Sequence, residues 1–97
     1  MEGNEILRQL VALAEEAGVG VRSVRPAEAE PPARSGLCRV RGRPVLVLSA
    51  ADPLEARIDA VAAALRLHGA SLLEGRFLPP ALRERLERAP ALPRDAR

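Results

Sequence analysis

This chain of 97 residues is nearly free of aromatic residues and contains no lysine. Phe77 is the only aromatic residue, and all 15 basic residues are arginines. A core filled by Leu, Val and Ala lacks the large areas that aromatic side chains bury, so we expect stabilising help from another subunit. The lysine-free composition with nine prolines suggests a GC-rich bacterial genome, and the scarcity of side-chain amides agrees with a thermophile.

Cysteine and long apolar runs are also scarce. Cys38 stands alone, so no intramolecular disulfide is expected. Residues 1–10 lack the basic segment and apolar run of a signal peptide, and no window approaches the ~20 apolar residues that cross a bilayer. We therefore expect a cytoplasmic protein without membrane contact. The net charge of +2 is too small to imply nucleic acid by itself.

The length fits a single α+β domain, which we place at residues 1–89 with a frayed tail at 90–97. Apolar residues at spacings of three and four predict an amphipathic helix over 4–17, capped by Asn4. Alternation predicts a short strand over 19–24, with Val19 and Val21 on one face and Arg22 and Val24 on the other. The proline-rich segment 25–35 is expected to be a loop that could cover a pocket.

A hairpin is expected next. Leu37 to Arg41 alternate, Gly42 and Arg43 can turn, and the aliphatic run 45–48 is typical of a central strand buried on both faces. Together with the short strand, this hairpin predicts a three-stranded, mainly antiparallel sheet.

Two helices are predicted to follow and to pack on the sheet. The first spans 53–68, with Asp52 as N-cap and Glu55 completing a capping box. Gly69 ends it, a connector follows, and a short helix starts at Pro80 with Leu82 and Leu86 directed inward.

Small residues crowd the predicted helix 53–68. They allow close approach of another backbone, and because they cover more than one side of the helix, one side is a candidate oligomer or packing face. Alternatively, alanine is simply the best helix former. The residues that we assign to this face are Ala60, Ala63, Ala64 and Leu67.

His68 is the only histidine and Cys38 the only cysteine, so these two residues are the first candidates for metal binding or nucleophilic catalysis. One histidine and one cysteine cannot supply the three or four ligands of a zinc site, so no metal and no cofactor are expected. His68 suits the C-terminal end of a helix, where a cation interacts favourably with the carbonyl groups. Cys38 with His68 as base would make a hydrolase, but Cys38 shares its strand face with apolar residues and fits a small buried side chain better.

Arginines concentrate between positions 22 and 43, where six of them face only two glutamates, a local charge of +4. An arginine-bearing β-hairpin can bind phosphates. We expect Arg39 and Arg41 to share one strand face, because they are two residues apart. No aromatic residue lies among them to stack on bases, and we favour a solvated, charge-protected sheet edge as their explanation. The candidate anion or nucleic-acid residues are Arg39, Arg41, Arg43 and Arg34.

The order of elements resembles the core of ImmA/IrrE-type zinc peptidases. The resemblance spans residues 6–68 and is carried by the hydrophobic pattern, the strand G-x-P-V-L-V-L and the helix start D-P-L-E. That family carries H-E-x-x-H on this helix, where this chain has Ala62, Ala63 and Arg66, or Ala63, Ala64 and Leu67 in the neighbouring register. The resemblance therefore implies a catalytically inactive relative that keeps the scaffold.

The leading hypothesis is a small non-enzymatic protein–protein interaction or scaffold domain, which self-associates as a homodimer or binds an unknown protein partner. Nucleic-acid binding through residues 34–43 is the first alternative. A hydrolase built on Cys38 and His68 is the second.

Overall fold

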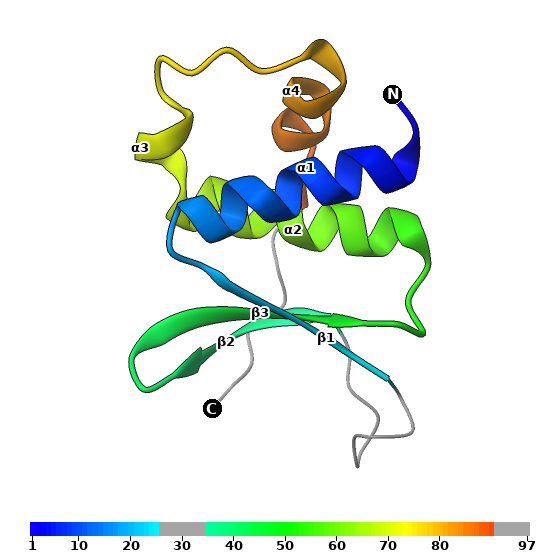
Figure 1. The fold of residues 1–97 in the computed structure, drawn as a ribbon, viewed down its shortest axis with the longest axis vertical. Coiled ribbons are helices and arrows are strands. Elements are labelled where there is room, and N and C mark those ends of the chain that lie inside the picture. Colours follow the sequence, from blue (N-terminus) through cyan, green and yellow to red (C-terminus); the bar gives the residue numbers. More distant parts are fainter. Residues whose placement is uncertain (26–34, 91–97) are drawn as a thin grey trace.

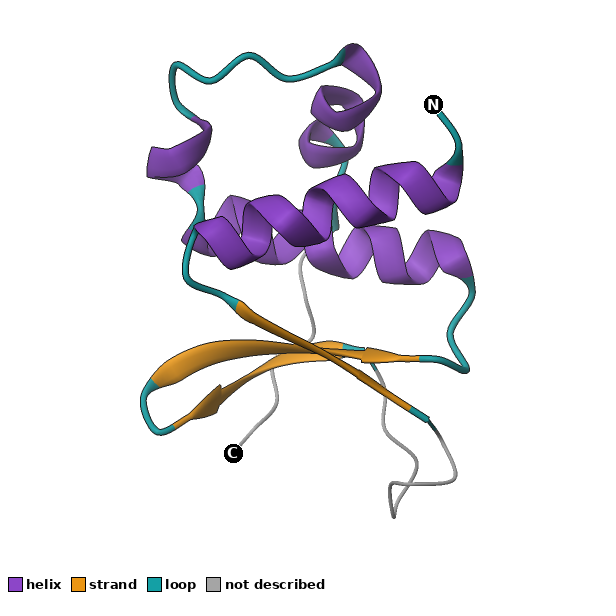
Figure 2. Cartoon of the chain, viewed as in Figure 1, coloured by secondary structure: helices purple, strands orange, loops and turns teal. Residues whose placement is uncertain are grey.

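The computed structural model describes residues 1–25 and 35–90 of the chain. Within them the fold is α+β, with one helix, a three-stranded sheet and then further helices. Figure 1 labels the elements and Figure 2 separates helices from strands. In chain order they are α1 (Gly3–Glu16), β1 (Gly20–Val24), β2 (Gly36–Val40), β3 (Arg43–Ser49), α2 (Leu54–His68), α3 (Ala70–Leu73) and α4 (Pro80–Glu87).

The sheet is mixed, with strand order β1-β3-β2. β3 pairs antiparallel with β2 and parallel with β1, so the expectation of a mainly antiparallel sheet was wrong for one of the two pairings. The difference arises because α1 leads into β1 from the helical layer, so β1 enters the sheet in the same direction as β3 (Figure 1). The predicted central position of β3 is confirmed, but its expected burial on both faces is wrong, because Val45 and Val47 are partly exposed.

The hairpin turn lies one residue earlier than expected, at Arg41 and Gly42. Both residues have positive φ, of 54° and 81°, as a two-residue type I′ turn requires. Glycine adopts this conformation without a steric penalty, so Gly42 takes the second turn position and Arg43 already belongs to β3.

Helix limits agree with the apolar spacing, but the predicted N-caps were wrong. α1 begins at Gly3, before Asn4, and α2 begins after Pro53; neither start has a side-chain cap. At α1 the reason is packing, because a Cβ on Gly3 would stand 2.7 Å from Leu54 Cδ2, so the two helix starts lie in close contact. At α2 the reason is that the Asp52 carboxylate accepts another bond, from the backbone amide of Ser35.

The helices occupy one side of the sheet in two tiers (Figure 2). α1 and α2 lie against β1 and β3, and α4 packs on α2 and α1. The second predicted helix, α4, was expected to pack on the sheet, but it packs on α1 and α2 instead. These two helices lie between α4 and the sheet (Figure 2). The connector after α2 contains the helical turn α3.

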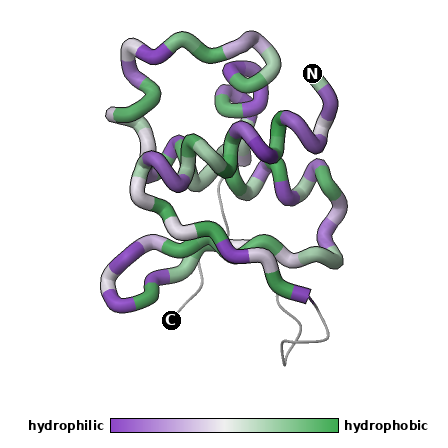
Figure 3. Tube along the Cα trace, in the orientation of Figure 1, coloured by the Kyte–Doolittle hydropathy of each residue, from purple (hydrophilic) through white to green (hydrophobic). Residues whose placement is uncertain are grey.

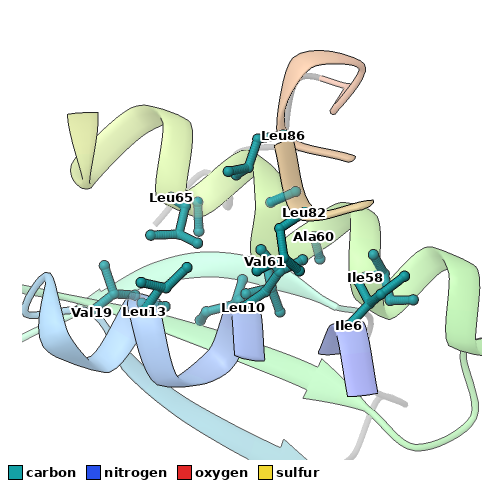
Figure 4. Packing of buried hydrophobic residues seen from close by; sticks show 14 of the residues in the cluster. Ile6, Leu10, Leu13, Val19, Ile58, Ala60, Val61, Leu65, Leu82 and Leu86 are labelled. Atoms are coloured by element: carbon teal, nitrogen blue, oxygen red, sulfur yellow. The ribbon is translucent and has the colours of Figure 1, made fainter. Parts of the chain in front are cut away.

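The core lies between the sheet and the helices and within the helical tiers. Figure 4 shows side chains of α1, α2 and α4 meeting there, Leu10, Val61 and Leu82 among them. The expected inward direction of Leu82 and Leu86 is confirmed. Among the described residues, no helix combines the length and hydropathy needed to cross a membrane.

Candidate functional site

The two faces of the sheet are built from alternate residues of the same strands. Leu46 and Leu48 of β3 are buried against the helices, and Val21 and Leu37, the two register partners of Leu46, pack on the same core. The residues between them point to the other face, because side chains alternate along a strand. We call that side the open face, since no described helix lies on it (Figure 1).

Five apolar residues form a continuous strip across the open face. The register places Val24 on β1, then Val47 and Val45 on β3, then Cys38 and Val40 on β2. The strip runs diagonally over all three strands, and we call it the apolar stripe. None of the five belongs to the described core or to the residues packed against it. Val40 is 45% exposed, and the other four are partly exposed.

Different side chains flank the apolar stripe on its two sides. Arg22, which is paired with Val47, and Arg43, which is paired with Val40, both lie on the side nearer β1. On the other side Gly36 has no side chain and Ser49 is buried. The alternation predicted for residues 19–24, with Arg22 and Val24 on one face, is confirmed. The stripe itself was missed, because it becomes visible only when the strand order and register are known.

The hairpin arginines gather at one end of the sheet but do not form one row. Arg39 lies on the same face of β2 as Leu37, the face toward the helices, and its Nη1 donates to the Gly42 carbonyl at 2.9 Å. Arg41 is in the turn, so the expectation that it shares a strand face with Arg39 was wrong. Figure 3 shows the hydrophilic character of this end. Arg34 lies outside the described residues.

No carboxylate within residues 1–25 and 35–90 forms an ion pair with Arg22, Arg39, Arg41 or Arg43. The ion pairs found there involve other arginines, as with Arg76 on Glu16 at 2.7 Å and Arg85 on Glu55 at 2.6 Å. Arg22, Arg41 and Arg43 are exposed. The open face and the adjoining turn therefore carry a positive charge that the described part of the chain does not neutralise.

Cys38 and His68 lie on opposite sides of the sheet. Cys38 is directed to the open face, beside Val45. His68 is the last residue of α2, on the helical side, and it is exposed. The structure does not bring a histidine base to the Cys38 thiol.

The three alanines that we assigned to the candidate oligomer or packing face of α2 are packed inside the chain. Ala60, Ala63 and Ala64 are 5%, 8% and 0% exposed, because α1, β3 and α4 surround this helix. Leu67, the fourth residue of the candidate oligomer or packing face, is 55% exposed and points away from that core. The small side chains thus serve contacts between elements of one chain.

Ser35, Ser49 and Asp52 form a polar cluster where β3 ends and α2 begins. The Ser35 amide donates to Asp52 Oδ2 at 3.2 Å, and the Ser49 amide donates to Ser35 Oγ at 2.9 Å. The Ala51 amide donates to Ser49 Oγ at 3.3 Å. Each side-chain oxygen satisfies a backbone donor, so the cluster holds the start of β2 to the end of β3.

Arg85 of α4 is the one buried charged residue among those described, and sequence reasoning did not single it out. It pairs with Glu55 and, at 3.3 Å, with Asp59, so it ties α4 to α2. The hydrogen bond to Glu55 raises the pKa of Arg85 above its ordinary value. Arg85 comes three residues after Leu82 and one before Leu86, so helical spacing places it on the buried side of α4. This spacing is the sequence signal that would have found it.

The described residues contain no cluster of three or more His, Cys, Asp or Glu side chains that could hold a metal ion. No protein-family model matches the chain, and neither a curated protein nor a solved structure matches it.

Proposed function

We propose that this protein is a non-enzymatic interaction domain that binds another protein through the open face of its sheet. The observation that carries the proposal is the apolar stripe, which crosses all three strands outside the core. Contiguous exposed apolar surface with a polar rim is typical of protein-binding sites. The inactive-peptidase scaffold suggested by the resemblance agrees with this function, and so does a cytoplasmic location in a bacterium.

Self-association through the open face is a weaker form of the same proposal. In a symmetric pair each copy would bring Arg22 and Arg43 into one interface, and like charges in a partly desolvated contact repel each other. The described helices also bury their apolar sides in the core of their own chain. A different protein therefore fits the face better than a second copy.

Cys38 offers a native probe of the open face, because it is the only cysteine and lies within the apolar stripe. The test begins with selection of binding peptides from a displayed library on the full chain. Each selected peptide is then assayed for its effect on the rate at which a thiol reagent labels Cys38. We expect the selected peptides to slow this labelling.

The matched control is Leu67→Cys in a Cys38→Ser background, which places the thiol on the exposed side of α2. We expect its labelling rate to be unchanged by the same peptides. Binders that protect the thiol at position 67 and leave Cys38 reactive would contradict the proposal, as would a library that yields no binder. Labelling of Cys38 that slows with protein concentration alone would instead show that the face binds a second copy.

A further inference from the structure

The dimensions of the apolar stripe match one helix. Its ends, Val24 and Val40, are three steps of two residues apart along the strands and two strand spacings apart across them. At the ordinary rise and spacing of a sheet this diagonal is about 22 Å long. A helix of about 15 residues covers that length, and its width of about 10 Å fits a three-stranded face.

The charges beside the stripe have a definite side and spacing. Arg22 and Arg43 both lie nearer β1, four residues of β3 and one strand apart. This spacing corresponds to about 14 Å between their backbones, or between two and three helical turns. On the opposite side Gly36 has no side chain, and Ser49 is 0% exposed, so no charged side chain stands there. A complementary helix would carry carboxylates along one side of its apolar strip and small or neutral side chains along the other.

We infer that the open face binds an amphipathic helix of another protein, about 15 residues long, with acidic residues along one side of its apolar strip. This inference rests on the proposed function and names the partner's chemistry. Apolar residues of that helix cover Val47, Val45 and Cys38, and its carboxylates pair with Arg22 and Arg43. A contact of this size belongs to the small, transient class of interfaces.

Two synthetic helical peptides test the charge requirement. Both carry leucines along one side, and they differ only in having glutamate or glutamine beside that strip. Their affinity for the full chain is measured by fluorescence anisotropy at low and at high salt. With two rim ion pairs of ordinary strength, we expect the glutamate peptide to bind about fivefold more tightly at low salt. This advantage should shrink at high salt, because rim pairs are screened.

Charge-neutralising variants locate the effect. In Arg22→Gln/Arg43→Gln the advantage of the glutamate peptide should disappear. In the matched control Arg83→Gln/Arg88→Gln, which removes one exposed arginine within α4 and one at its C-cap, it should remain. Both pairs remove the same charge, so a general electrostatic attraction would affect them equally.

The outcomes separate this inference from the proposed function. Equal binding of the two peptides, with protection of Cys38 by both, would overturn the acidic partner and leave the interaction face. Binding that favours glutamate in the Arg22→Gln/Arg43→Gln variant would overturn the site. If neither peptide binds while the display library yields binders at Cys38, the helical partner is wrong. A thymidine oligonucleotide that binds more tightly than the glutamate peptide and depends on Arg22 and Arg43 would show a nucleic-acid surface instead.

Discussion

Leu46 and Val47 are neighbours in one strand, yet they belong to different surfaces. Leu46 is 0% exposed beneath the helices, whereas Val47 is partly exposed in the middle of the apolar stripe. The helix-facing side of the sheet supplies stability through close packing, and the open face keeps apolar area available for a partner. A continuous aliphatic strand therefore does not show how many of its faces are covered by its own chain.

Truncating these two neighbours should separate the two faces most clearly. Leu46→Ala removes a fully buried side chain and leaves a cavity, so it should lower the free energy of unfolding by about 2–5 kcal/mol. Val47→Ala removes partly exposed atoms outside the core and should cost less than about 1 kcal/mol. Equilibrium urea denaturation measures both values. Equal losses would show that the open face is packed as a core.

Adding volume to α2 tests the assignment of its alanines to internal packing. Ala64→Leu inserts a large side chain where the residue is 0% exposed, and it should destabilise the fold by about 1–3 kcal/mol. The matched control Leu67→Ala, on the exposed side of the same helix, should change stability by less than about 0.5 kcal/mol. The reverse ranking in thermal unfolding would mean that the described packing of α2 is wrong.

The hairpin turn positions Val40 and Arg43 on the open face, and its conformation is set by residues 41 and 42. Gly42→Ala places a Cβ at a φ of 81° where it touches nothing, so only backbone strain results. The expected cost is about 1 kcal/mol in urea denaturation. Arg41→Asn, which suits the same turn, should be neutral or slightly stabilising. A destabilising Arg41→Asn together with a neutral Gly42→Ala would contradict the type I′ assignment.

Acid pH should lower the stability of the fold by weakening the ion pair between Glu16 and Arg76. We expect this loss of stability to be smaller than those of the substitutions above. The hydrogen bond from Arg76 lowers the pKa of Glu16 below its ordinary value of 4.5. A carboxyl with a depressed folded pKa stabilises the fold above its unfolded value, and this stabilisation is lost as the pH falls through the folded pKa. Thermal melts between pH 6 and about pH 3 should therefore lose less stability in Arg76→Gln than in the parent. Identical pH profiles would show that this ion pair contributes nothing.

Much of the fold was predictable because its signals are local. Periodicity placed α1, α2, α4 and all three strands, and a proline at the first helical position marked the start of α4. The caps failed because tertiary contacts decided them, through Leu54 at Gly3 and through Ser35 at Asp52. The parallel pairing of β1 depends on how α1 crosses the sheet, which no local pattern records.

The candidate surface was predictable only in its parts. Alternation correctly set Arg22 and Val24 on one face of their strand, and the concentration of arginines around the hairpin was plain from the sequence. The diagonal of apolar residues arises from the pairing of three strands that are distant in sequence. Its flanking arginines come from β1 and β3, so their common side follows from register and cannot be obtained from composition.

The binding of the glutamate peptide to Val47→Asp is the most direct test of the open face as an interaction surface. This substitution places a carboxylate in the centre of the apolar stripe, beside Arg22 and away from the core. Fluorescence anisotropy should show binding lost by at least about tenfold, because an apolar anchor becomes a desolvated charge. The unfolding midpoint in urea should stay close to that of the parent. Wild-type affinity in a folded Val47→Asp protein would contradict the account.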